Sequence, residues 1–286
     1  MIRASIKIIS KTWLHVVSIS SVVYCKFNSS AVPVGYFKKP NFGDLLTPLI
    51  FNHFDIKAIH VPKFRYAKAI GVGSLIHMSS PDFQGVFLGS GLISDEKLTF
   101  KNAQALLVRG NKTVDNLSLP ASTLVGDPGL LIADVFSEFR STVKPVFEFG
   151  IIPHYVDKDH PALLNFINSL PVKSRYVIID VRKSPKEVFM MVAKCKIILS
   201  SSLHGLITAD SLEIPNVWIK ISQNIIGQEF KFLDYYSSFD EFRMPFNLEK
   251  ISVKDISTLA TSRDSKKLQK VKLNIYSAYE RFKSIV

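Results

Sequence analysis

Apolar and polar segments alternate along the chain at the spacing of an α/β protein. Short apolar runs end in glycine, serine or charged residues, and longer helix-like segments separate them. This pattern predicts strands at Val32–Phe37, Ala67–Val72, Gly85–Leu88, Ala105–Val108, Ser122–Val125, Phe149–Ile152, Tyr176–Asp180, Ile197–Leu199 and Val217–Ile219. It predicts helices over Leu45–Phe54, Asn111–Leu117, Pro161–Leu170 and Pro185–Ala193. Strands that alternate with helices in this way favour parallel sheets, whose ligands lie beyond the carboxyl ends of the strands.

The chain is long enough for two domains, and the strand and helix pattern is interrupted by polar residues near 136–146. We therefore predict an N-terminal extension (1–30), a Rossmann-like domain (31–143) and a second Rossmann-like domain (144–262) that carries the donor site. A basic amphipathic helix (263–286) would follow, because four apolar residues recur there at three-, four- and seven-residue spacings: Leu268, Val271, Ile275 and Phe282.

Charge is concentrated at the two ends of the chain, which has a net charge of +12. Residues 1–30 carry four bases and no acid, and residues 263–286 carry seven bases and two acids. Basic ends that also bear apolar residues favour contact with an anionic membrane surface over nucleic acid, although a solvated helix face remains the simpler alternative. The apolar run Trp13–Tyr24 is too short to span a bilayer comfortably.

Only two cysteines, Cys25 and Cys195, occur, and they lie far apart in the sequence. This favours a reducing, cytoplasmic location, with the inner face of the cytoplasmic membrane as a possible place of contact. No cluster of histidine and cysteine has metal-ligand spacing, so we predict neither a bound metal nor a cofactor.

The segment from Lys196 to Asn216 carries the clearest candidate chemistry. An apolar run breaks into Ser200, Ser201 and Ser202, and His204-Gly205 then begins a helix-like segment. Hydroxyls and free backbone N–H groups at a helix start suit a phosphate or carboxylate, and a histidine adds a proton or a charge. Serines are also ordinary helix caps, so the segment alone leaves a structural role open.

The stretch Ser200–Ile207, followed by Ile214-Pro215-Asn216, resembles the C-terminal signature of the polysaccharide pyruvyl transferase family. Five further segments match the family in the expected order, within a region from about Val34 to Tyr235: Asn41–Asp44, Gly89–Gly91, Val108–Gly110 with Thr113, Gly126–Gly129 and Pro153–Tyr155. The ordered set is specific, whereas each segment alone is weak.

The resemblance implies two Rossmann-like halves that face a cleft, as in the GT-B architecture. It implies transfer of a pyruvyl group from phosphoenolpyruvate to two hydroxyls of a sugar in a bacterial surface-polysaccharide precursor, with a lipid-linked acceptor, forming a cyclic ketal. Such a reaction needs cationic or N–H partners for the donor's phosphate and carboxylate. Its methylene carbon must gain a proton, and the sugar hydroxyls must lose theirs.

The matching residues receive roles on this basis. His204 would be the donor-side acid or a phosphate ligand, and Arg109 would bind the donor with its guanidinium fork. Asp44 or His154 would handle the acceptor proton, although Asp44 is equally suited to capping a helix, His154 to a backbone bond and Arg109 to a local ion pair. The other candidate binding residues lie in the same motifs: Asn41, Gly43, Ser90, Gly91, Ser200, Ser201, Ser202, Leu203 and Gly205.

One position departs from the family pattern. Many members have arginine two residues before this histidine, where the present chain has Ser202. The lost positive charge would have to come from elsewhere, with Arg182, Lys183 and Lys220 as candidates. Two alternatives therefore stay open: a GT-B-type glycosyltransferase that uses a nucleotide sugar, and a non-catalytic polysaccharide assembly factor.

Overall fold

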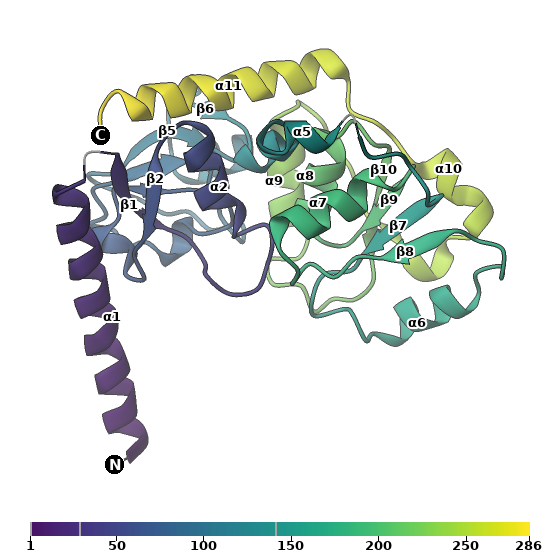
Figure 1. Ribbon diagram of the computed structural model, residues 1–286, viewed down its shortest axis with the longest axis horizontal. Helices are drawn as coiled ribbons and strands as arrows, with labels where there is room; N and C mark the ends of the chain where they lie inside the picture. Colours follow the sequence, from purple (N-terminus) through teal and green to yellow (C-terminus); the bar gives the residue numbers. More distant parts are fainter. Residues whose placement is uncertain (1, 29, 141) are drawn as a thin grey trace.

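The computed structural model describes residues 2–28, 30–140 and 142–286, which form two parallel sheets surrounded by helices (Figure 1). The α/β class predicted from the sequence is therefore confirmed, whereas the GT-B-like arrangement remains a prediction. The first sheet contains β1 (Ala31–Gly35), β2 (Lys57–His60), β3 (Ala69–Ile70), β4 (Val86–Leu88), β5 (Gln104–Val108) and β6 (Leu124–Val125). The second sheet contains β7 (Phe149–Ile152), β8 (Tyr176–Ile178), β9 (Ile198–Ser200), β10 (Asn216–Lys220) and β11 (Phe246–Asn247).

Both sheets place their strands in the same relative order. The first runs β2-β1-β3-β4-β5-β6, and the second runs β8-β7-β9-β10-β11 when read from its β8 edge. Each sheet thus has a switch point, between β1 and β3 in the first sheet and between β7 and β9 in the second. Ligands of such sheets bind beyond the carboxyl ends of the strands at this point, because the flanking connections there leave on opposite faces.

The helices connect and cover these strands. They are α2 (Leu46–His53), α3 (Asn111–Asn116), α4 (Ile132–Val135), α5 (Ser137–Arg140), α6 (Pro161–Asn168), α7 (Pro185–Ala193), α8 (Leu203–Ser211), α9 (Phe230–Ser237) and α10 (Ile256–Leu259), with α1 (Ile2–Lys26) and α11 (Ser265–Lys283) near the ends. The start of α7 illustrates the local rules: Ser184 and Glu187 form a capping box around Pro185, whose missing N–H costs nothing at this position.

The largest of three hydrophobic clusters among the described residues contains residues of both halves. Helix α8, from the second half, packs against α4 and against the short 3-10 helix Pro128–Leu131 of the first half. Helix α11 runs back along the first half and packs on β5 and β6 (Figure 1). Its predicted apolar stripe is buried at all four positions, which confirms the amphipathic C-terminal helix: Leu268, Val271, Ile275 and Phe282.

Several elements were not predicted, namely the strands β2 and β11 and the helices α4, α5, α9 and α10. Strand β2 is short and half-exposed, and α9 begins without a side-chain cap, so neither carries a clear sequence signal. The apolar N-terminal segment is helical as α1, which Figure 1 shows extending away from the sheets. Among the described residues, no helix is both long and apolar enough to cross a bilayer.

Candidate functional site

A cavity of about 690 Å³ lies at the carboxyl ends of the strands of both sheets. Its walls come from the loops after β1, β3, β4, β7, β8 and β10, from the start of α8 and from one residue of α9. Loops at the switch points of both sheets therefore line the same cavity, which lies where ligands of such sheets bind. Its polar lining residues include Asn41, Asp44, Ser74, His154, Arg182, Ser202, His204 and Lys231.

The serine run fixes the start of α8 and ties two of the cavity loops together. Ser200 Oγ accepts the Ser202 N–H at 3.0 Å and lies 3.0 Å from the Ile152 carbonyl oxygen. Ser201 Oγ accepts the His154 N–H at 2.9 Å and donates to Asp157 at 3.2 Å. Ser200 and Ser201 are therefore occupied by protein groups, and of the three serines only Ser202 lines the cavity.

Helix α8 points its amino terminus at this cavity. The N–H groups of Gly205 and Leu206 both bond to the Ser202 carbonyl oxygen, and Ser202 provides no side-chain cap. Within the part of the chain that the structure describes, the N–H groups of Leu203 and His204 have no acceptor. Free N–H groups and the positive end of the helix dipole make this a place where an anion is stabilised.

His204 lies at the same helix start and is 8% exposed. Its Nε2 atom is buried without a hydrogen-bond partner among the described residues. Burial, together with the nearby charges of Lys231 and Arg109, lowers the pKa of His204 to about 3, so the imidazole is neutral at physiological pH. The shift has the direction predicted from the helix dipole, but burial is its main cause.

Gly43 allows the loop after β1 to approach this histidine. A Cβ atom at Gly43 would lie 2.0 Å from His204 Nδ1, and Phe42 meets the imidazole edge to face with ring centroids 6.2 Å apart. Gly43 itself does not line the cavity. Gly205 likewise acts through packing, since a Cβ there would lie 2.4 Å from Ser200 Oγ.

Asp44 faces the cavity from the loop after β1. Its Oδ2 accepts a hydrogen bond from Asn41 Nδ2 at 3.0 Å, and α2 has Leu45 as its N-cap without a side-chain cap. The capping role is therefore absent. Burial raises the pKa of Asp44 to about 7, against the opposing effect of Lys231, so this carboxyl group can gain or lose a proton near neutrality.

Sequence reasoning missed Lys231, which reaches the cavity from α9. Burial and the nearby Arg109 lower its pKa to about 8, although Asp44 and Asp157 act in the opposite direction. No ion pair of Lys231 occurs within the described residues. Its ammonium group lies 5.5 Å from the centre of the Phe232 ring. Lys231 thus offers a positive charge that no carboxylate neutralises directly.

The three cations expected to replace the missing arginine differ in position. Arg182 lines the cavity but is paired with Asp180, its Nε lying 2.9 Å from Oδ1. Lys220 is paired with Glu229, and neither Lys220 nor Lys183 lines the cavity. Lys231 is therefore better placed than any of the three.

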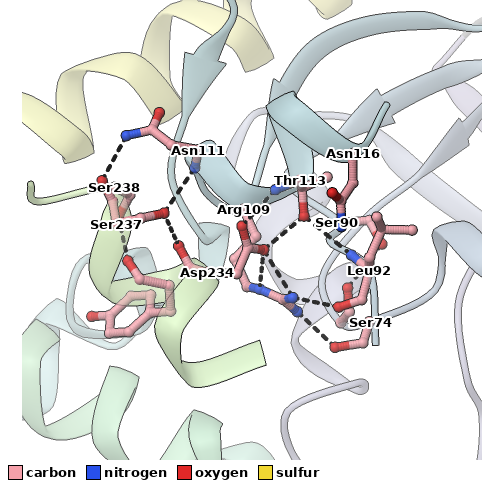
Figure 2. A network of polar contacts seen from close by, with 12 residues as sticks. Ser74, Ser90, Leu92, Arg109, Asn111, Thr113, Asn116, Asp234, Ser237 and Ser238 are labelled. Atoms are coloured by element: carbon pink, nitrogen blue, oxygen red, sulfur yellow. Dashed lines mark hydrogen bonds and ion pairs between the residues drawn. The ribbon is translucent and has the colours of Figure 1, made fainter. Parts of the chain in front are cut away.

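Arg109 does not line the cavity, and its side chain is fully buried. Figure 2 shows its contacts. The Nε and Nη2 atoms each lie 2.9 Å from Asp234 Oδ2, Nη1 donates to Ser74 Oγ at 2.6 Å, and Nη2 donates to the Leu92 carbonyl oxygen at 2.5 Å. The guanidinium group, which was expected to bind the donor, thus bonds to protein groups, because Asp234 of α9 lies beside the end of β5. Arg109 joins the two halves and supports the cavity wall at Ser74.

Ser90 and Gly91 support the same wall from behind. Ser90 Oγ accepts the Leu75 N–H at 3.1 Å and donates to the Gly73 carbonyl oxygen at 2.8 Å. A Cβ at Gly91 would lie 2.4 Å from the guanidinium carbon of Arg109. Neither residue lines the cavity.

His154 lines the cavity opposite these groups, on the loop after β7. Burial, with a contribution from Lys231, lowers the pKa of His154 to about 3. Its imidazole is therefore neutral at physiological pH and is suited to accepting or donating a hydrogen bond to a hydroxyl group.

Comparison with known proteins identifies the family to which the sequence is similar. The family model described as polysaccharide pyruvyl transferase matches residues 40–223. An uncharacterized protein of Acanthamoeba polyphaga mimivirus is 31% identical over 202 residues, which cover 66% of this chain and 68% of that protein. The succinoglycan biosynthesis protein ExoV of Rhizobium meliloti is 24% identical over 128 residues, which cover 45% of this chain and 38% of ExoV. Lys231 and Asp234 lie beyond the matched segment of the family model.

Proposed function

Because the chain belongs to the polysaccharide pyruvyl transferase family, we propose that it transfers a pyruvyl group from phosphoenolpyruvate to a sugar of a surface-polysaccharide precursor. The product would be a pyruvate ketal bridging two sugar hydroxyls. The observation that supports this proposal is that the start of α8, His204 and Lys231 line one cavity. Among the described residues, His204 Nε2 has no hydrogen-bond partner, α8 has no side-chain cap and Lys231 has no ion pair.

These groups suit a small donor with two acidic groups. Lys231 would bind one of them by charge, and the start of α8 would bind the other through N–H donors. A neutral His204 would donate a hydrogen bond from Nε2, and a bound anion would raise its pKa toward the range in which it transfers a proton. Lys231 would thus supply the positive charge that is missing because this chain has Ser202 where many family members have arginine.

The reaction needs one proton added and two removed. The donor's methylene carbon gains a proton, and the first sugar hydroxyl loses its proton as its oxygen bonds to the adjacent carbon. The bond from that carbon to the phosphate oxygen then breaks, and inorganic phosphate leaves with the bonding electrons. The second hydroxyl loses its proton as it closes the ketal. Of the two protons released, one balances the proton gained by the methylene carbon, and the other protonates the departing phosphate.

Asp44 and His154 are the groups proposed to handle the acceptor. Asp44 has a pKa of about 7, so its ionised form would take a hydroxyl proton at neutral pH. His154 would orient the second hydroxyl by a hydrogen bond. Both residues line the same cavity as Lys231, which keeps the donor and the acceptor within one site.

Acceptor-dependent phosphate release from phosphoenolpyruvate tests the proposal. We expect release with a sugar-lipid acceptor, its loss in Lys231→Met and His204→Gln, and its retention in Lys173→Met, which removes an exposed lysine outside the cavity. No release with any acceptor in a set of polysaccharide precursors would contradict the proposal. A rise in melting temperature with nucleotide sugars, and none with phosphoenolpyruvate, would instead favour a glycosyltransferase.

A further inference from the structure

Helix α1 is attached to the rest of the protein along one side. Ser18 Oγ accepts the Lys63 N–H at 3.2 Å, and Ser21 Oγ donates to the His60 carbonyl oxygen at 3.2 Å. One turn earlier, His15 Nδ1 lies 3.2 Å from the Tyr66 hydroxyl. Positions 15, 18 and 21 are three residues apart, so they share one face of the helix.

The opposite side of α1 carries a continuous apolar stripe that nothing covers within the described residues. Trp13, Val16, Ile19 and Val23 are 65%, 50%, 49% and 45% exposed. Their spacing of three, three and four residues also defines a single face. At about 100° per residue, the centre of this stripe lies roughly 150° around the helix from the attached face.

The charges along α1 are positive, and those beside it are mostly positive. The helix sequence contains Arg3, Lys7, Lys11 and Lys26 and no acidic residue. On the adjoining surface Lys57, Arg65 and Lys68 are exposed. Of the carboxylates nearby, Asp55 is paired with Lys283 at 2.9 Å and Asp82 interacts with Arg65. An exposed apolar stripe on a basic helix is the composition of a helix that lies in the interface of an anionic bilayer.

We propose that α1 docks this protein on anionic lipid bilayers, with Trp13, Val16, Ile19 and Val23 inserted at the boundary of headgroups and acyl chains. Docking through α1 and its adjoining surface does not depend on the proposed reaction. Lipid is a better occupant of the stripe than a second copy of the chain, because the basic residues of α1 and its surroundings are attracted to anionic headgroups and repel a copy with the same charges.

The two tryptophans of the chain allow a site-specific test. Trp13 is exposed, whereas Trp218 is 6% exposed and stacks on Phe232 with ring centroids 4.5 Å apart. A change of emission on lipid binding therefore reports Trp13. Vesicles of equal parts phosphatidylcholine and phosphatidylglycerol should shift the emission to shorter wavelength, and the shift should be absent in Trp13→Phe.

Sedimentation with the same vesicles measures the affinity. Val16→Ser with Ile19→Ser should weaken binding about tenfold or more, because two inserted apolar side chains are lost. Lys26→Ala, which removes an exposed lysine of the helix, should weaken it by up to about fivefold at low salt. The matched control is Val172→Ser with Phe242→Ser, which removes two exposed apolar side chains elsewhere and should leave binding unchanged. An unchanged melting temperature shows that each variant is folded.

Three results would overturn the proposal. One is the absence of an emission shift with anionic vesicles, and another is equal binding to vesicles of phosphatidylcholine alone. The third is a dimer, detected by light scattering, that dissociates in the Val16→Ser, Ile19→Ser variant, because a second copy of the chain would then be the occupant of the stripe.

Discussion

Replacing Arg109 with methionine should destabilise the protein strongly, because its guanidinium group is part of a fully buried ion pair. The change removes both contacts to Asp234 at 2.9 Å and the bonds to Ser74 and Leu92. Asp234 would keep the hydrogen bonds from the Thr113 N–H and hydroxyl at 2.8 and 2.7 Å, but its charge would be buried without a cation.

Removing one partner of such a pair costs about 3–5 kcal/mol of the free energy of unfolding. That is a large share of the roughly 5–15 kcal/mol by which folded proteins are stable. The midpoint of urea unfolding, followed by far-ultraviolet circular dichroism, should therefore fall by about 1–2 M. Asp234→Leu should cause a similar loss, and the double variant Arg109→Met, Asp234→Leu should recover part of it, since no unpaired charge remains.

Arg182→Met is the matched control within the same molecule. Arg182 and Asp180 also form an ion pair, but their side chains are 44% and 39% exposed, and such pairs contribute about 0–1 kcal/mol. The reasoning is refuted if Arg109→Met retains the wild-type urea midpoint while losing phosphate release. That result would return Arg109 to the role of a donor ligand.

Three further predictions concern the cavity. Lys231→Met should raise the KM for phosphoenolpyruvate at least about tenfold, and Lys231→Arg should restore it. The pKa of Lys231 is lowered to about 8, so the wild-type protein should lose affinity for phosphoenolpyruvate as the pH rises through about 8. Lys231→Arg should keep its affinity, because arginine stays charged in this range. If kinetics show that both proteins lose affinity alike, Lys231 is not the donor-binding cation. Gly43→Ala should lower kcat/KM about a hundredfold, because the added Cβ atom displaces the His204 ring. A variant with wild-type kcat/KM would show that the position of this ring does not matter for the reaction. The pKa of His204 is lowered from 6.5 to about 3, so between these pH values the imidazole is protonated in the unfolded chain but not in the folded protein. The free energy of unfolding should therefore fall by up to about 5 kcal/mol as the pH drops from about 6.5 to about 3. In His204→Asn, urea unfolding at a series of pH values should show a flatter acid limb, and an unchanged limb would contradict the buried, neutral state.

The sequence predicted the parts of the fold that follow from local patterns. Strand β7 and helix α7 have the predicted bounds, since an isolated apolar run and a proline-containing capping box are local signals. The cavity loops were also predictable, because polar residues directly follow strands at Asn41, His154 and Ser202. Parallel strands bring such loops to one edge of a sheet.

The parts that the sequence did not reveal depend on distant contacts. The partner of Arg109 is 125 residues away on α9, so no local pattern distinguishes a buried ion pair from a ligand-binding arginine. Lys231 lies on the same unpredicted helix, among aromatic residues and without a motif. Both residues acquire their roles only when α9 packs beside the end of β5.

The most direct test of the proposed reaction follows the donor carbon into the product. Phosphoenolpyruvate is labelled isotopically at the carbon that bears the phosphate and incubated with the protein and a sugar-lipid acceptor. We expect nuclear magnetic resonance to find the label in a ketal carbon bonded to two sugar oxygens, with no such product from Lys231→Met. Label that stays in phosphoenolpyruvate, or that appears only as free pyruvate while the acceptor is unchanged, would contradict pyruvyl transfer.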